Sequence, residues 1–306
     1  TLMILAVVIS LVLINESFGS SGMDFLSVIE MERYTKIFVT DDFMQRNHFI
    51  KSFIGGMFIT ICMTGLDQDM MQKNLTCKTL SAAKTNMIVY SFILVVVTFL
   101  FLILGAMIFV YADQNQIMIP LVDGSPKTDL LFPEVALNGD LGKGLGVIFI
   151  LGLIAAAYSS ADSALTSLTT SFCIDFLKFD NYSVKLQQKL RKRTHVFMSV
   201  ILVTVVIIFR HILDRNVIDG LLTVASYTYG PLLGLFTFGI LTPFKIRDKK
   251  VWIVVAVSIA IIFFIGTLSS DTLGGYEIGY ELLPLNGIVT FIGLLLIREK
   301  SPATSE

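Results

Sequence analysis

A cluster of hydroxyl side chains with the carboxylate of Asp162 among them lies inside an otherwise apolar stretch, residues 151–177, whose end carries a second carboxylate, Asp175. A carboxylate at the centre of a bilayer costs about 2.5–3.5 kcal/mol on insertion scales, so it usually faces a cavity, an ion or a partner. Hydroxyl and carbonyl oxygens are hard ligands, which suit an alkali cation better than a transition metal. The stretch therefore predicts a cation site within a membrane helix. Its polar members are Tyr158, Ser159, Ser160, Asp162, Ser163, Thr166, Ser167, Thr169, Thr170 and Ser171.

The rest of the chain supplies membrane helices that would position this cluster. The 306 residues are 54% hydrophobic and 15% charged, and their mean hydropathy of +0.77 lies far outside the range of soluble domains. A helix needs about 20 apolar residues to span a bilayer. We therefore expect an all-α polytopic membrane protein with about eight transmembrane helices in a single domain, residues 1–306. The candidate spans are residues 1–14, 49–66, 87–112, 145–170, 195–210, 217–241, 251–268 and 285–297.

Basic residues alternate between the loops. One alternate set of connecting segments carries 15 Lys or Arg residues and the other carries 6. The positive-inside rule places the basic set in the cytoplasm. This pattern predicts a multi-pass protein of the plasma membrane with a cytoplasmic C-terminus. The basic set comprises residues 67–86, 177–194, 241–250 and 298–306.

The basic run from Lys185 to Arg193 belongs to this set, and it fits two interpretations. It could recognise a lipid headgroup or calmodulin, or it could simply set the topology of two neighbouring spans. The second interpretation is favoured. A separate segment, residues 23–38, has apolar residues at helical spacing and predicts an amphipathic helix in an outer loop.

Two spans contain interruptions that a plain membrane anchor does not need. The first runs from Gly55 through Thr60 and Thr64 and meets polar residues at Asp67. Helix unwinding beside polar groups exposes backbone carbonyls in several transporter folds. The second contains Gly230 followed by Pro231, which we expect to interrupt the hydrogen-bond ladder.

Three blocks of the sequence together resemble the sodium:solute symporter family. They are residues 65–75 (GLDQDMMQKNL), residues 155–165 closing on 175–177, and residues 229–236 (YGPLLGLF) with Gly239. The resemblance covers nearly the whole chain and implies an inverted-repeat fold with a ten-helix core. It implies that residues 1–14 are the end of the fifth core helix, that residues 49–241 form core helices six to ten, and that residues 251–297 form two peripheral helices. The chain would then be an N-terminally truncated fragment whose missing N-terminal half is a partner of the helices present.

The resemblance also implies an ion site. The family's sodium site uses a backbone carbonyl and two hydroxyls, which fall at Ala156, Ser159 and Ser160. These three positions lie within one turn of a helix. The structural alternative is that the hydroxyls bond to their own helix carbonyls or pack against a neighbour. A second ion site would fall at Asp162 and Ser163, where Asp162 could bind sodium, carry a coupled proton or form a salt bridge.

The solute is less well specified. Sugar-transporting relatives carry Asn and Tyr where this chain has Thr60 and Met63, which argues against a sugar. The residues expected near a solute pocket or gate are Thr60, Met63, Thr64 and Asp67, and Asp67 could equally be a cap contact. The tyrosines Tyr90, Tyr227 and Tyr229 are interpreted as packing or interfacial aromatics.

The sequence thus favours sodium-coupled symport of a small organic solute, with Na⁺ as the coupling ion and no other metal or cofactor. A proton-coupled transporter using Asp162 and a transporter-like membrane sensor are the alternatives. An enzyme is disfavoured, because His48, His195 and His211 are scattered and no catalytic constellation accompanies them. No nucleic-acid partner is expected.

Overall fold

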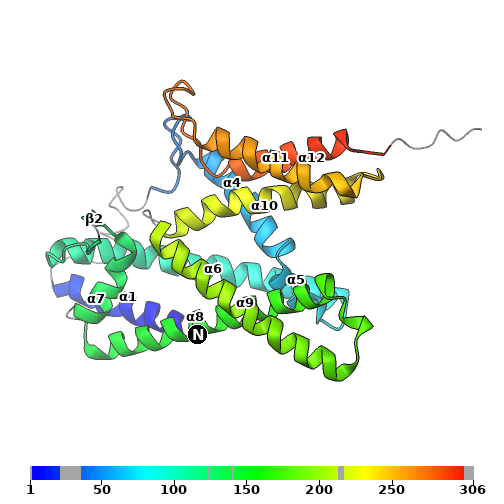
Figure 1. The fold of residues 1–306 in the computed structure, drawn as a ribbon. Coiled ribbons are helices and arrows are strands. Elements are labelled where there is room, and N and C mark those ends of the chain that lie inside the picture. Colours follow the sequence, from blue (N-terminus) through cyan, green and yellow to red (C-terminus); the bar gives the residue numbers. More distant parts are fainter. Residues whose placement is uncertain (1, 21–35, 123, 140, 213–216, 300–306) are drawn as a thin grey trace, which may run out of the picture. The chain divides into compact units, whose positions relative to one another are not determined.

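The computed structural model describes residues 2–20, 36–122, 124–139, 141–212 and 217–299 (Figure 1). The segment expected to form an amphipathic helix, residues 23–38, lies mostly outside this part of the chain. The chain divides into two compact units. Unit 1 comprises residues 1–36 and 72–217, and unit 2 comprises residues 37–71 and 218–306.

The predicted all-α polytopic architecture is confirmed. Six of the described helices are long and apolar enough to cross a membrane. A seventh candidate is a bent pair, α4 (Phe49–Gly65) and α5 (Gln68–Leu75), whose axes differ by 53°. The apolar helix α12 (Leu282–Leu296) is shorter, at 15 residues. The six are α1 (Leu2–Ser20), α6 (Leu80–Gln114), α8 (Lys143–Ser171), α9 (Val184–Ile212), α10 (Val217–Leu241) and α11 (Asp248–Gly266).

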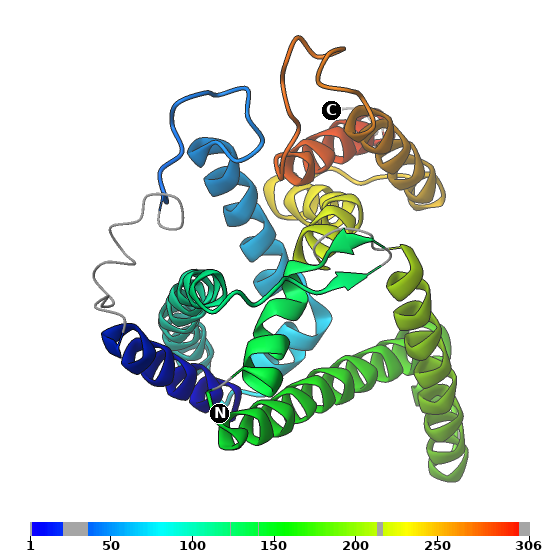
Figure 2. The ribbon, with the colours of Figure 1, turned by 90° about the vertical axis from the view of Figure 1, so that its left-hand side faces the viewer.

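Unit 1 is built around the packing of α1 against α6 and α8 (Figure 2). Its apolar core joins Phe18 of α1, Met107 of α6 and Phe149 of α8, all of them buried. A short helix, α7 (Leu131–Asn138), adds Val135 to the same core. Gly152 of α8 permits the close approach of α1, because a Cβ there would lie 3.0 Å from a backbone nitrogen of that helix.

The connections of unit 1 are short. An antiparallel pair of two-residue strands, β1 (Leu121–Val122) and β2 (Ser125–Pro126), follows α6. A 3₁₀ turn, η1 (Thr128–Leu130), leads from them into α7. At its C-terminal end α8 widens into a π-helical turn, η2 (Phe172–Phe176), before a second 3₁₀ turn, η3 (Phe179–Asn181). These turns place the C-terminal end of α8 against α9.

Unit 2 packs α4, α10 and α11 against α12. Polar groups as well as apolar ones join these helices. The Thr290 hydroxyl of α12 donates to the Ser258 hydroxyl of α11 at 2.9 Å, and both side chains are buried. At Gly55 of α4, an added Cβ would lie 2.5 Å from the Cβ of Tyr280.

The helix α10 continues through Pro231, so the expected interruption does not end the helix. Proline has no N–H, which leaves the carbonyl of Tyr227 without its usual helical donor. The buried side chain of Asn286 supplies one, because its Nδ2 lies 3.2 Å from that carbonyl and 3.1 Å from the carbonyl of Ser226. An amide sixty residues away therefore stabilises this stretch of α10.

A buried lysine anchors the loop before α12 to the start of α4. Lys51 is 4% exposed and its Nζ donates to the carbonyl oxygens of Gln45 and Glu277. The same Nζ lies 3.8 Å from the Glu281 carboxylate and 3.8 Å from the centre of the Tyr276 ring. The charge of Lys51 is thus paired and hydrogen-bonded, as burial requires.

Candidate ion and solute sites

The residues expected to bind sodium lie on α8, in unit 1. Ala156, Ser159 and Ser160 occupy a regular part of this helix, and all three are exposed. In an α-helix, positions separated by three, four and seven residues share one face. Ala156, Ser159, Ser160 and Ser163 therefore form one stripe along α8.

Neither serine bonds to its own helix. Within the part of the chain that the structure describes, the hydroxyls of Ser159 and Ser160 make no hydrogen bond. Other hydroxyls in unit 1 do bond in this way: Ser91, Ser199 and Thr204 each donate to the carbonyl four residues earlier at 2.8–2.9 Å. The stripe thus presents two hydroxyl oxygens with open coordination positions.

The second-site candidates are also on α8. Asp162 is exposed, and its carboxylate makes no ion pair or hydrogen bond with the described residues. Ser163 is half-buried. Asp162 is three residues from Ser159 and two from Ser160, so it lies on the flank of the stripe and closer to Ser159.

The residues expected near a solute pocket lie in unit 2. Thr60, Met63 and Thr64 are at i, i+3 and i+4 of α4 and so share a face. Met63 is 47% exposed, and the Thr60 hydroxyl donates to the Gly56 carbonyl at 2.8 Å. Asp67 follows the end of α4, at the bend before α5.

Both carboxylate oxygens of Asp67 accept hydrogen bonds at the bend between α4 and α5. Its Oδ1 accepts hydrogen bonds from the backbone N–H groups of Asp69 and Met70, at 2.9 and 3.3 Å, and so caps α5. Its Oδ2 accepts a hydrogen bond of 2.9 Å from the hydroxyl of Tyr229 on α10. The expected unwinding near Asp67 is present, and the cap contact is one of the two roles expected for this residue.

Sequence reasoning missed three residues of unit 2. Tyr229 was expected to be a packing or interfacial aromatic, and this was wrong in that its hydroxyl bonds to Asp67. Asn286 and Lys51 were not singled out. The signal for both was local: each is a polar or charged residue within a predicted span, where an unpaired group is costly.

No protein-family model matches this chain. It is 24% identical over 61% of its length to the sodium/sialic acid symporter SiaT of Proteus mirabilis (strain HI4320), covering 38% of that protein. It is 24% identical over 66% of its length to the sodium-coupled monocarboxylate transporter 2 of Mus musculus, covering 33%. The same transporter of Bos taurus is 26% identical over 76% of the chain, with 38% of the relative covered.

The chain thus spans about a third to two fifths of the length of the curated relatives it matches. These relatives are transporters and not enzymes, in agreement with the expectation from sequence. The resemblance of this chain to the sodium:solute symporter family is confirmed over 61–76% of its residues.

Proposed function

We propose that this chain is part of a sodium-coupled symporter for a small organic solute, and that Ala156, Ser159 and Ser160 contribute to its sodium site. The carbonyl of Ala156 can accept a second interaction beyond its helical one, since a carbonyl oxygen has two lone pairs. One sodium ion moving inward gains about 2.3 kcal/mol per 100 mV of membrane potential, in addition to its concentration gradient. Binding sodium and solute together would couple that free energy to uptake.

One observation carries the ion site in this proposal. The hydroxyls of Ser159 and Ser160 are exposed on one face of α8 and do not bond within the described residues. This differs from the alternative in which membrane hydroxyls bond back to their own helix. The remaining sodium ligands would come from helices outside residues 1–306, because the relatives are longer than this chain.

The solute in this proposal is a small organic anion. The relatives are named for sialic acid and for monocarboxylates, and both names specify carboxylic acids. Thr60, Met63 and Thr64 would line the solute path from α4. That the solute is not a sugar stays a prediction.

The orientation is part of the same proposal. The basic connecting segments, including the tail after α12, would face the cytoplasm at the plasma membrane. Cys77 lies in one of these segments and is partly exposed, whereas Cys62 and Cys173 are buried. A membrane-impermeant maleimide should label Cys77 in inside-out vesicles and spare it in intact cells. Labelling of Cys77 in intact cells would show that the orientation is the opposite of the one proposed.

The experiment uses the full natural protein that contains this chain, reconstituted in proteoliposomes. Uptake of a panel of carboxylates is compared under a sodium gradient and a matched potassium gradient. Accumulation that requires sodium supports the proposal. Equal accumulation with potassium rejects sodium coupling.

Proton coupling is the second candidate, because the Asp162 carboxylate is exposed and has no partner among the described residues. In that case a proton gradient alone drives uptake, and Asp162→Asn abolishes it. If solute binds but no gradient drives accumulation, the protein is a membrane sensor with a transporter-like fold.

A further inference from the structure

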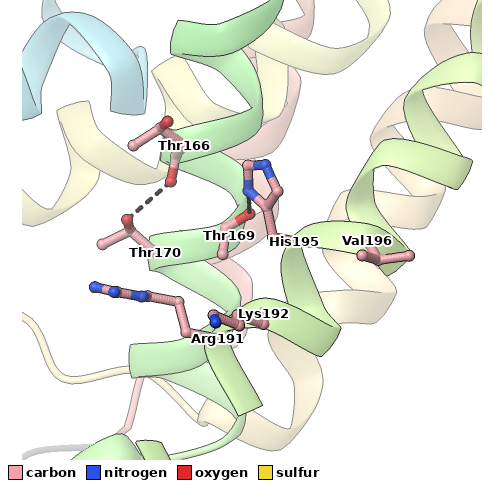
Figure 3. A pocket seen from close by; sticks show the side chains of 7 residues that line it. All are labelled: Thr166, Thr169, Thr170, Arg191, Lys192, His195 and Val196. Atoms are coloured by element: carbon pink, nitrogen blue, oxygen red, sulfur yellow. Dashed lines mark hydrogen bonds between the residues drawn. The ribbon is translucent and has the colours of Figure 1, made fainter. Parts of the chain in front are cut away.

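A pocket of about 520 Å³ lies in unit 1 between the last turns of α8 and the third and fourth turns of α9 (Figure 3). The helix α8 contributes three hydroxyls, from Thr166, Thr169 and Thr170. The facing helix contributes Arg191 and Lys192, with His195 one turn further along. Most of the pocket surface is apolar, and its polar groups are hydroxyls on one side and cationic groups on the other.

The two cations of the pocket are uncompensated. Among the described residues, Arg191 and Lys192 make no ion pair and no hydrogen bond, and no acidic side chain lines the pocket. Both side chains are charged at neutral pH. The pocket thus concentrates about two positive charges without a protein anion to balance them, which favours an anionic ligand.

The donors in the pocket suit a phosphate group. A guanidinium presents N–H groups in a fork that matches two phosphate oxygens, and an ammonium adds a compact charge beside it. The Thr166 hydroxyl is exposed and makes no hydrogen bond within the described part of the chain, so it can donate to a ligand. Thr169 is buried, and its hydroxyl lies 3.3 Å from Nδ1 of His195, which holds the imidazole at the pocket wall.

The position of the pocket along the two helices agrees with this chemistry. The basic segment of α9 ends at His195, and a run of mainly apolar residues begins at Val196 and continues to Phe209. The pocket therefore lies where a membrane helix passes from its basic end into its apolar part. Basic pockets between membrane helices at this level bind phosphorylated lipid headgroups.

We propose that the α8–α9 pocket binds a phosphate group, held by Arg191 and Lys192 and by the hydroxyl of Thr166, which is free within the described residues. The hydroxyl of Thr170 is already used, since it donates to the Thr166 carbonyl at 2.8 Å. The phosphate of an anionic lipid and a soluble phosphate share this chemistry. The site is separate from the proposed sodium stripe, and its test does not depend on transport.

Binding is measured on the purified natural protein in detergent, by native mass spectrometry for lipids and equilibrium dialysis for soluble phosphate. The lipid probes are phosphatidic acid and phosphatidylcholine with the same acyl chains, and the soluble probe is inorganic phosphate at constant ionic strength. The test variant is Arg191→Gln with Lys192→Gln. The control is Lys185→Gln with Lys189→Gln, which removes the same charge from exposed positions of α9 outside the pocket.

Preferential binding of phosphatidic acid, weakened about tenfold or more in the test variant and much less in the control, supports the proposal. Thr169→Val keeps the charge and should weaken binding by a smaller factor, because it removes the contact to His195. Displacement of the lipid by inorganic phosphate would identify the phosphate group alone as the ligand, and no displacement would identify the lipid. Equal losses in test and control variants, or no binding of either phosphate probe, would overturn the proposal.

Discussion

The hydroxyl of Tyr229 donates a 2.9 Å hydrogen bond to Oδ2 of Asp67, although the two residues are 162 positions apart. The other oxygen of the same carboxylate caps α5. The Asp67 side chain thus fixes the bend between α4 and α5 and connects that bend to α10. All the residues that make these contacts belong to unit 2.

Tyr229→Phe should reduce the free energy of unfolding by about 1.5–3 kcal/mol, the range for hydrogen bonds to charged groups. The measurement is unfolding in mixed micelles. Tyr90→Phe is the matched control, because Tyr90 is 41% exposed and its hydroxyl has no partner among the described residues. Asp67→Ala should lower the free energy of unfolding more than Tyr229→Phe does, since the cap is also removed. The double variant completes a double-mutant cycle that isolates the contact between the two side chains. A change in Tyr229→Phe no larger than in Tyr90→Phe would contradict the contact.

Asn286→Ala should destabilise the protein by about 1–3 kcal/mol, because it leaves the partly buried carbonyl of Tyr227 without a donor. Adding Pro231→Ala should recover part of this loss, since the new N–H at position 231 can bond to that carbonyl. The unfolding free energies of the two single variants and the double variant give the coupling. Strict additivity would show that Asn286 does not substitute for the missing proline donor.

Two glycines of α10 should respond differently to the same substitution. A Cβ at Gly234 would lie 2.6 Å from the backbone oxygen of Gly287 and from Cβ of Thr290, whereas a Cβ at Gly239 meets nothing within 4 Å. Gly234→Ala should therefore cost about 1–3 kcal/mol through overpacking. Gly239→Ala should be neutral or stabilising, as alanine favours helix. Thermal unfolding of both variants checks this, and similar shifts would refute the close approach of α10 and α12.

Tyr276, in the loop before α12, should make the free energy of unfolding depend on pH in the alkaline range. Burial raises the pKa of Tyr276 from 10 to about 12, and the hydrogen bond to Glu281 and its negative charge add to the rise. Because the folded state holds the phenolic proton more tightly, this stabilisation is complete below pH 10 and disappears as the pH rises through 12. Unfolding midpoints between pH 9 and 12 should fall less steeply in Tyr276→Phe than in the wild type. Tyr182→Phe, an exposed loop tyrosine, should leave the wild-type slope unchanged.

Local sequence patterns predicted much of the fold. Apolar run length located the spanning helices, and the polar residues from Asp67 onward located the bend, because both signals arise from neighbouring residues. The continuity of α10 through Pro231 could not be predicted in the same way. It depends on Asn286, which only the packing of α12 brings to that position.

The same distinction, between signals from neighbouring residues and contacts that need the packed fold, applies to the candidate sites. The residues of the stripe on α8 could be named from the sequence, because the family resemblance implies Ala156, Ser159 and Ser160 and helical spacing places them on one face. The partner of Asp67 could not, since Tyr229 is an ordinary aromatic until the fold places its hydroxyl 2.9 Å from the carboxylate. The α8–α9 pocket likewise needs two helices, and the basic run of α9 by itself favours topology-setting charge.

The most direct test of sodium binding on α8 is the sodium concentration that gives half-maximal uptake by the full natural protein in proteoliposomes. We predict that Ser160→Ala raises this concentration about tenfold or more, the loss expected when one ligand of a bound cation is removed. Thr204→Ala removes an exposed hydroxyl of α9 that bonds to its own helix, and it should leave the value unchanged. An unchanged value in Ser160→Ala, or an equal rise in both variants, would contradict the assignment of the sodium site to this stripe.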